Sequence, residues 1–109
     1  MFITEELELR DKVKKLRDFL GENLLYVVAF GSRVRGDFEW DSDLDVLVVI
    51  NKRDLSIENE IRKIFYDDPF SPYSLIVMDN ELYKRHEMLN TPFLNNIRRD
   101  GKVFYEHKG

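Results

Sequence analysis

Apolar residues recur along the chain with two different periods, which predict alternating strands and helices. Short runs rich in β-branched and aromatic residues are typical of buried strands, whereas apolar residues spaced three and four apart predict amphipathic helices. The strands are expected at 24–30, 44–50, 73–78 and 102–106, the last at a sheet edge. The helices are expected at 4–20, 56–67, 80–89 and 92–100, and a polar connection covers 31–42.

Small polar residues, proline and glycine predict where the helices begin and end. Thr4 is a candidate cap for the first helix and Gly21 its stop, while Thr91 followed by Pro92 is typical of a helix start. Buried strands joined by amphipathic helices predict a sheet covered by helices, and therefore an α/β or α+β fold.

Length and composition limit the classes of protein further. A chain of 109 residues with 43% hydrophobic residues and no composition shift predicts a single domain over residues 1–109. The net charge of −4 argues against non-specific nucleic-acid binding, because holding the phosphates would require a basic surface. The absence of cysteine excludes disulfides and Cys-ligated metals. No run is long enough for a membrane helix, so we expect a cytoplasmic protein without membrane attachment.

The residues with chemical potential lie between the first two expected strands. Gly31 and Ser32 follow directly after the first strand. Glycine lets the backbone approach a ligand closely, and the residues after Ser32 are expected to form a short helix whose free N–H groups face an anion. A plain turn is the alternative. The spacing of Gly31 and Gly36 does not make a Walker loop, because the required Lys and Ser/Thr are absent.

Asp43 and Asp45 introduce the second strand, and ten residues separate Ser32 from Asp43. Because they are two apart, their side chains are expected on one face, where two carboxylates favour a hard divalent cation such as Mg²⁺ or Mn²⁺. A solvated acidic turn is the alternative. Residues 31–50 carry a net charge of −3, so a triphosphate would bind here only together with the metal.

The run GSRVRGDFEWDSDLDVLVV resembles the signature of the DNA polymerase β-like nucleotidyltransferase superfamily, which is Gly-Ser, ten residues and Asp-x-Asp. At this length the chain is most similar to the minimal nucleotidyltransferases (MNT), the MntA-like antitoxins that are paired with HEPN toxins. The resemblance implies a nucleotidyltransferase fold with a small mixed sheet.

It also implies roles for the matching residues. Gly31 and Ser32 would hold the β- and γ-phosphates of a nucleoside triphosphate, while Asp43 and Asp45 would hold the metal and be the catalytic carboxylates. Arg33 and Arg35 would contact phosphates, or else belong to a solvated turn paired with Asp37 or Glu39. Ser42 would cap the turn and orient Asp43.

The sequence departs from the family pattern at one position. Fully equipped members place a third carboxylate on the later strand, where this chain has Ser74. Asp67 and Asp68 are substitutes only if their loop folds back, and Asp79 is expected on the opposite face. The departure puts catalytic activity in doubt.

Together with the carboxylate pair, the resemblance implies an Mg²⁺-dependent transfer of a nucleoside monophosphate, AMP from ATP, to a hydroxyl. The resemblance implies a tyrosine of a HEPN toxin as the acceptor and an antitoxin role for this chain. The alternative is a weak or inactive module that binds nucleotide or partner and neutralises by steric cover. A small-molecule adenylyltransferase is less favoured, because 109 residues leave little room for a second domain that would form the acceptor pocket.

Overall fold

A four-stranded mixed sheet forms the centre of the computed structural model, which describes residues 2–36 and 43–108. The spatial order is β3-β2-β1-β4, so β4 lies at an edge as expected. β1 pairs antiparallel with β2 and β4, whereas β2 and β3 are parallel. The strands are β1 (Leu24–Phe30), β2 (Leu44–Ile50), β3 (Tyr73–Asp79) and β4 (Lys102–Glu106).

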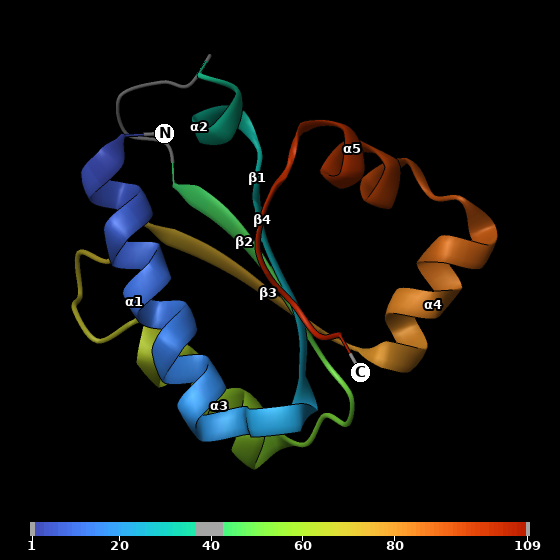
Figure 1. The fold of residues 1–109 in the computed structure, drawn as a ribbon, viewed down its shortest axis with the longest axis horizontal. Helices are drawn as coiled ribbons and strands as arrows, with labels where there is room; N and C mark the ends of the chain where they lie inside the picture. Colours follow the sequence, from blue (N-terminus) through green and yellow to red (C-terminus); the bar gives the residue numbers. More distant parts are fainter. Residues whose placement is uncertain (1, 37–42, 109) are drawn as a thin grey trace.

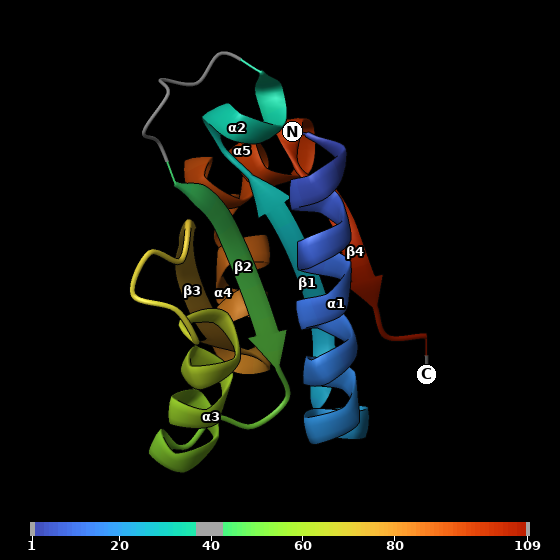
Figure 2. The ribbon, with the colours of Figure 1, turned by 90° about the vertical axis from the view of Figure 1, so that its left-hand side faces the viewer.

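Helices cover both faces of this sheet. Two lie against one face and two against the other, and Figures 1 and 2 show these layers from two directions. The first pair is α1 (Ile3–Leu20) and α3 (Leu55–Phe65), and the second is α4 (Asn80–Leu89) and α5 (Pro92–Asp100). A short helix α2 (Ser32–Arg35) follows β1, and a 3₁₀ turn (Gly21–Asn23) joins α1 to β1.

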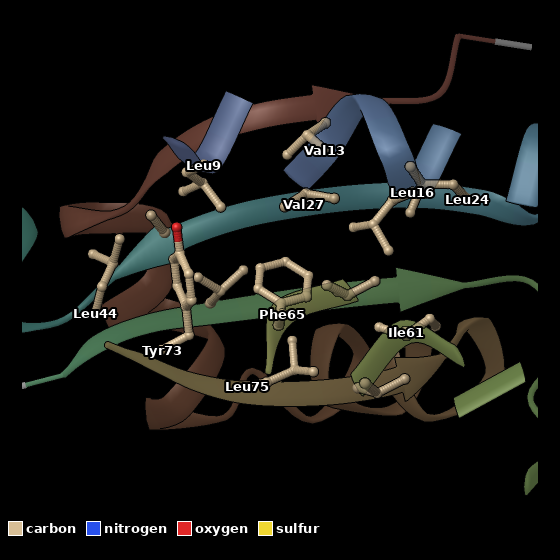
Figure 3. Close-up of a cluster of buried hydrophobic side chains, with 14 of the residues drawn as sticks. Leu9, Val13, Leu16, Leu24, Val27, Leu44, Ile61, Phe65, Tyr73 and Leu75 are labelled. Carbon is tan, nitrogen blue, oxygen red and sulfur yellow. The ribbon is translucent and has the colours of Figure 1, made fainter. Parts of the chain in front are cut away.

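The larger hydrophobic core lies between the sheet and the first pair of helices (Figure 3). Leu9, Val13 and Leu16 form the buried stripe of α1, as the helical spacing predicts. Phe65 from α3 meets Tyr73 of β3 edge to face, with ring centroids 5.2 Å apart. This packing fixes the beginning of β3 beside the beginning of β2.

A smaller cluster lies on the other face, under α4 and α5. Val28, Leu47, Val49 and Met78 point from the sheet toward Ile97 of α5. Successive strand residues alternate between faces, so the odd positions of β2 and the even positions of β1 and β3 belong to this side.

Two helices begin at positions other than the expected ones. Thr4 is not the cap of α1, because the helix starts at Ile3 and Phe2 is the N-cap. The backbone N–H of Phe2 donates to Glu5 Oε1 at 3.3 Å, so a glutamate in the first turn replaces the expected threonine. Asp54 Oδ1 accepts from the N–H of Ile57 at 2.8 Å, so α3 starts at Leu55 and ends at Phe65, two residues early.

Other expected helix ends are confirmed. Gly21 ends α1 with φ 54°, and Thr91 Oγ1 accepts from the N–H of Leu94 at 3.3 Å just before Pro92. Asp79 caps α4 by accepting from the N–H of Leu82 at 2.8 Å. Within residues 2–36 and 43–108, no helix is long and apolar enough to cross a membrane.

Candidate functional site

The expected site residues gather where β1 ends and β2 and β3 begin. Asp45 on β2 pairs with Phe30 of β1 on one side and with Ser74 of β3 on the other. Asp45 and Leu47 are two residues apart on β2, so their side chains lie on the same face of the sheet. The side chain of Leu47 belongs to the cluster beneath α4 and α5. The carboxylate therefore lies on the α4/α5 face of the sheet, at the end near α2.

Gly31 leaves space for the Asp45 side chain. A Cβ built on Gly31 would lie 2.2 Å from Asp45 Oδ2 and 3.2 Å from its Cγ, far inside contact distance. Gly31 also has φ 86° and ψ −168°, a conformation that is essentially restricted to glycine. Two independent constraints therefore require glycine here, and both concern the position of the Asp45 carboxylate and the turn beside it.

The structure brings Asp43 and Asp45 together. Asp43 is exposed just before β2, and Asp45 is half-buried within the strand. Burial raises the pKa of Asp45 above its ordinary value, and the negative charge of Asp43 raises it further. A hydrogen bond with Ser74 and the positive charge of Arg35 act in the opposite direction without cancelling the rise in the Asp45 pKa. A cation between the two carboxylates would relieve this repulsion.

α2 begins at Ser32, immediately after Gly31, which confirms the short helix expected after the Gly-Ser pair. The N–H of Gly36 donates to Ser32 O at 2.9 Å, and Gly36 ends the helix in the left-handed conformation. α2 therefore holds Ser32 at the end of β1, next to Gly31.

Arg33 is held by α1. Its Nε and Nη2 donate to Glu5 Oε2 at 2.9 and 2.8 Å, and the two side chains are only 13% and 15% exposed. The sequence suggests phosphate or the nearby acidic residues Asp37 and Glu39 as the partners of Arg33. Asp37 and Glu39 lie outside the described residues, and the contact with Glu5 ties the turn after β1 to the first helix.

Arg35 is the arginine of α2 whose charge lowers the pKa of Asp45, and its side chain is exposed. With Gly31 it borders a hollow of about 220 Å³ that reaches α5. The other residues that line this hollow are Phe30, Phe93, Asn96 and Ile97. No signal in the sequence places Phe93 or Asn96 here, because no local spacing relates α5 to the Gly-Ser turn.

Ser74 lies beside Asp45, where the family pattern would place the third carboxylate. The candidate substitutes lie elsewhere: Asp67 pairs with Lys12 at 2.7 Å, and Asp68 accepts from the N–H of Phe70 at 2.8 Å. Asp79 caps α4. In the part of the chain that the structure describes, no cluster of three or more acidic, histidine or cysteine side chains could hold a metal. Ser42 lies outside the described residues.

Comparison with known proteins identifies the family. Residues 9–105 match the nucleotidyltransferase domain family, and the chain belongs to it. The chain is 31% identical over 102 residues to a "putative protein adenylyltransferase" of Methanocaldococcus jannaschii. This match covers 89% of the present chain and 96% of that protein.

Solved structures share the fold. A complex of a tri-AMPylated Shewanella oneidensis HEPN toxin with an MNT antitoxin matches with a TM-score of 0.54 at 17% identity, over 94% of this chain and 72% of that one. A spectinomycin adenyltransferase from Enterococcus faecialis, solved with ATP and spectinomycin, matches with a TM-score of 0.61 at 23% identity. That match covers 95% of this chain and 57% of that one. The predicted nucleotidyltransferase fold is thus confirmed, and the chain is a nucleotidyltransferase-domain protein.

Proposed function

We propose that the protein transfers AMP from ATP to a hydroxyl group of a partner protein, with Asp43 and Asp45 as the catalytic carboxylates. The observation that carries the proposal is the close pairing of these carboxylates at the sheet end beside Gly31 and Ser32. The adenylyltransferase relative supports a protein as the acceptor, because it matches nearly the whole chain.

A divalent cation fits the residues present. Burial and then the charge of Asp43 raise the pKa of Asp45, and the two carboxylates form an oxygen-ligand set suited to Mg²⁺ or Mn²⁺. Asp43 and Asp45 would hold the cation together with phosphate oxygens of the nucleotide. When bound, it would neutralise phosphate charge and make the α-phosphorus more open to attack.

The remaining groups orient the triphosphate. Gly31 allows close approach of the backbone, and Ser32 supplies a hydroxyl and a backbone N–H for the β- and γ-phosphates. Arg35 adds positive charge on the same side, with Arg33 and Ser42 as further contacts predicted from the sequence. A bond forms between the acceptor oxygen and the α-phosphorus as the bond to the bridging oxygen of pyrophosphate breaks. The hydroxyl proton passes to water.

The partner proposed for this activity is a HEPN toxin, modified on tyrosine, for which this chain would be the antitoxin. The MNT–HEPN complex that shares the fold, with its AMPylated toxin, supports this choice. A second function is favoured by Ser74, because the lack of a carboxylate there agrees with a module that binds nucleotide or partner without transfer. The protein would then neutralise its partner by covering it.

One experiment separates these functions. The protein, Mg²⁺ and ATP labelled at the α-phosphate are incubated with the candidate toxin, beside Asp43→Asn, Asp45→Asn and the exposed control Asp18→Asn. We expect wild type and Asp18→Asn to transfer the α-label, but not a γ-label, to the toxin. The Asp43→Asn and Asp45→Asn variants should transfer neither. Absence of label, together with toxin neutralisation by all four proteins, would replace the transferase by the binding module.

A further inference from the structure

Ser74 holds a defined position beside the candidate metal-binding carboxylate. In the parallel pairing of β2 with β3, Ser74 is the register partner of Asp45. Ser74, Ile76 and Met78 are spaced two apart on β3, so they share one face of the sheet. Ile76 and Met78 belong to the cluster beneath α4 and α5, so the side chains of Ser74 and Asp45 both lie on that face. The Ser74 hydroxyl lies near enough to the Asp45 carboxylate to lower its pKa.

Gly31 bounds the same carboxylate from the direction of β1. Oδ2 of Asp45 occupies the space where a Cβ of residue 31 would stand. The Asp45 side chain thus lies between a glycine that leaves room for one oxygen and a serine that is its register partner on the neighbouring strand. In a strand, two side-chain rotamers are common, and these two neighbours favour one of them.

We propose that Ser74 is a positioning residue whose hydroxyl donates to Asp45 and holds that carboxylate in the orientation that binds the divalent cation. This inference rests on the proposed function, because it assumes that Asp45 is a metal ligand. A carboxylate that accepts one hydrogen bond keeps lone pairs for a cation. Hydrogen bonds to metal-binding side chains commonly fix their orientation, and their loss typically costs about 10–100-fold in metal affinity.

The choice of serine rather than a carboxylate has a physical consequence. An aspartate at position 74 would place a third negative charge beside Asp45, whose pKa the charge of Asp43 already raises. Serine instead supplies a donor, so it orients Asp45 without adding repulsion. The site then has one carboxylate held on two sides, Asp45, and one exposed carboxylate, Asp43.

The test measures binding rather than turnover. Isothermal titration calorimetry with Mn²⁺ and an ATP analogue carrying a methylene between the α- and β-phosphorus reports metal–nucleotide affinity without transfer. The informative pair is Ser74→Thr and Ser74→Val, because these side chains have nearly the same shape and differ in the hydroxyl. Both are β-branched and suit a strand. Ser74→Ala and the exposed Ser56→Ala complete the set, and thermal melting of each variant monitors the fold.

We expect Ser74→Val and Ser74→Ala to bind about tenfold more weakly than wild type, and Ser74→Thr and Ser56→Ala to bind within about threefold of it. Equal affinity of the Thr and Val variants would overturn the positioning role. A wild-type protein that does not bind the Mn²⁺ complex would instead contradict the proposed metal site itself. Because affinity is compared between variants of matched shape, a general loss of stability would affect both and would not produce the expected difference.

Discussion

Gly31 and Asp45 lie far apart in the sequence, yet the carboxylate of Asp45 occupies the space that a side chain on Gly31 would need. A Cβ at position 31 would lie only 2.2 Å from Asp45 Oδ2. The position of the Asp45 carboxylate therefore requires glycine at position 31, which links the Gly-Ser pair to the Asp-x-Asp pair. The separation of Gly31 and Asp45 by thirteen intervening residues is bridged by the antiparallel pairing of Phe30 with Asp45.

Replacement of Gly31 by alanine should abolish transfer and weaken binding of the Mn²⁺–nucleotide complex by more than about tenfold, because Asp45 has to move. The control is Gly36→Ala: Gly36 has nearly the same φ, 87°, but no atom of residues 2–36 and 43–108 lies within 4 Å of the position that its Cβ would take. Both variants incur backbone strain of about 1–3 kcal/mol. Only Gly31→Ala should lose binding, and equal binding losses in the two would attribute the effect to strain alone.

The pattern of apolar runs predicts most of the fold. The runs at 24–30, 44–50 and 102–106 coincide with strands, because a short β-branched and aromatic run between polar turns has few other ways to bury its side chains. The local caps were less predictable. Thr4 and Glu5 both offer an acceptor near the same helix start, and the sequence does not say which of them reaches a free N–H.

The site was predictable where a resemblance supplied the spacing. Gly31, Ser32, Asp43 and Asp45 share one end of the sheet, as expected. The contact of Arg33 with Glu5 was not predictable, because it joins residues 28 apart through the packing of α1. A periodic pattern fixes which face of a helix is buried, but it does not specify which charged residue at the rim meets a distant arginine.

The two arginines after Ser32 should respond differently to substitution. Arg33→Gln leaves the Glu5 carboxylate, only 15% exposed, without its bidentate partner, and should cost about 1–3 kcal/mol of unfolding free energy. Arg35→Gln should weaken nucleotide binding several-fold, because it removes the positive charge that acts on the Asp45 carboxylate. Denaturant unfolding and calorimetry on both variants make the comparison. An Arg33→Gln protein of normal stability and reduced affinity would assign Arg33 chiefly to phosphate.

Acid should weaken the link between α1 and α2. Burial alone would raise the pKa of Glu5, but hydrogen bonds from Arg33 and the backbone of Phe2, with the Arg33 charge, bring that pKa below 4.5. A carboxyl with a lowered folded-state pKa stabilises the protein above about pH 4.5, and this contribution is lost as the pH falls through the folded-state value.

The variant Glu5→Gln should therefore show a flatter loss of stability than wild type below pH 4.5, measured by urea unfolding at a series of pH values. Glu8→Gln is the control on the same helix, since Glu8 is exposed. Parallel acid profiles for wild type and Glu5→Gln would show that the pair contributes no pH-dependent stability.

Repulsion between the Asp43 and Asp45 carboxylates should lower the free energy of unfolding of the metal-free protein. Burial and Asp43 raise the pKa of Asp45 above 3.8, so between 3.8 and the raised value the folded protein holds a proton that the unfolded chain has released. Stability without metal therefore falls as the pH rises through this window, and at neutral pH the full repulsion is present. Asp43→Asn and Asp45→Asn should each raise the metal-free melting temperature by a few degrees, as expected for relief of ~0.5 kcal/mol of like-charge repulsion.

Adding Mn²⁺ with the nonhydrolysable ATP analogue should reverse this order, because a cation held by both carboxylates stabilises only the folded protein that retains them. The wild type should gain several degrees and the two asparagine variants little or nothing, as followed by circular dichroism at neutral pH. Removal of one carboxylate should thus raise the melting temperature without the cation and lower it, relative to wild type, when the cation is bound. This pair of results would show that the two carboxylates bind the cation and destabilise the metal-free fold. Variants that melt below wild type in the absence of metal would instead give Asp43 and Asp45 a structural role.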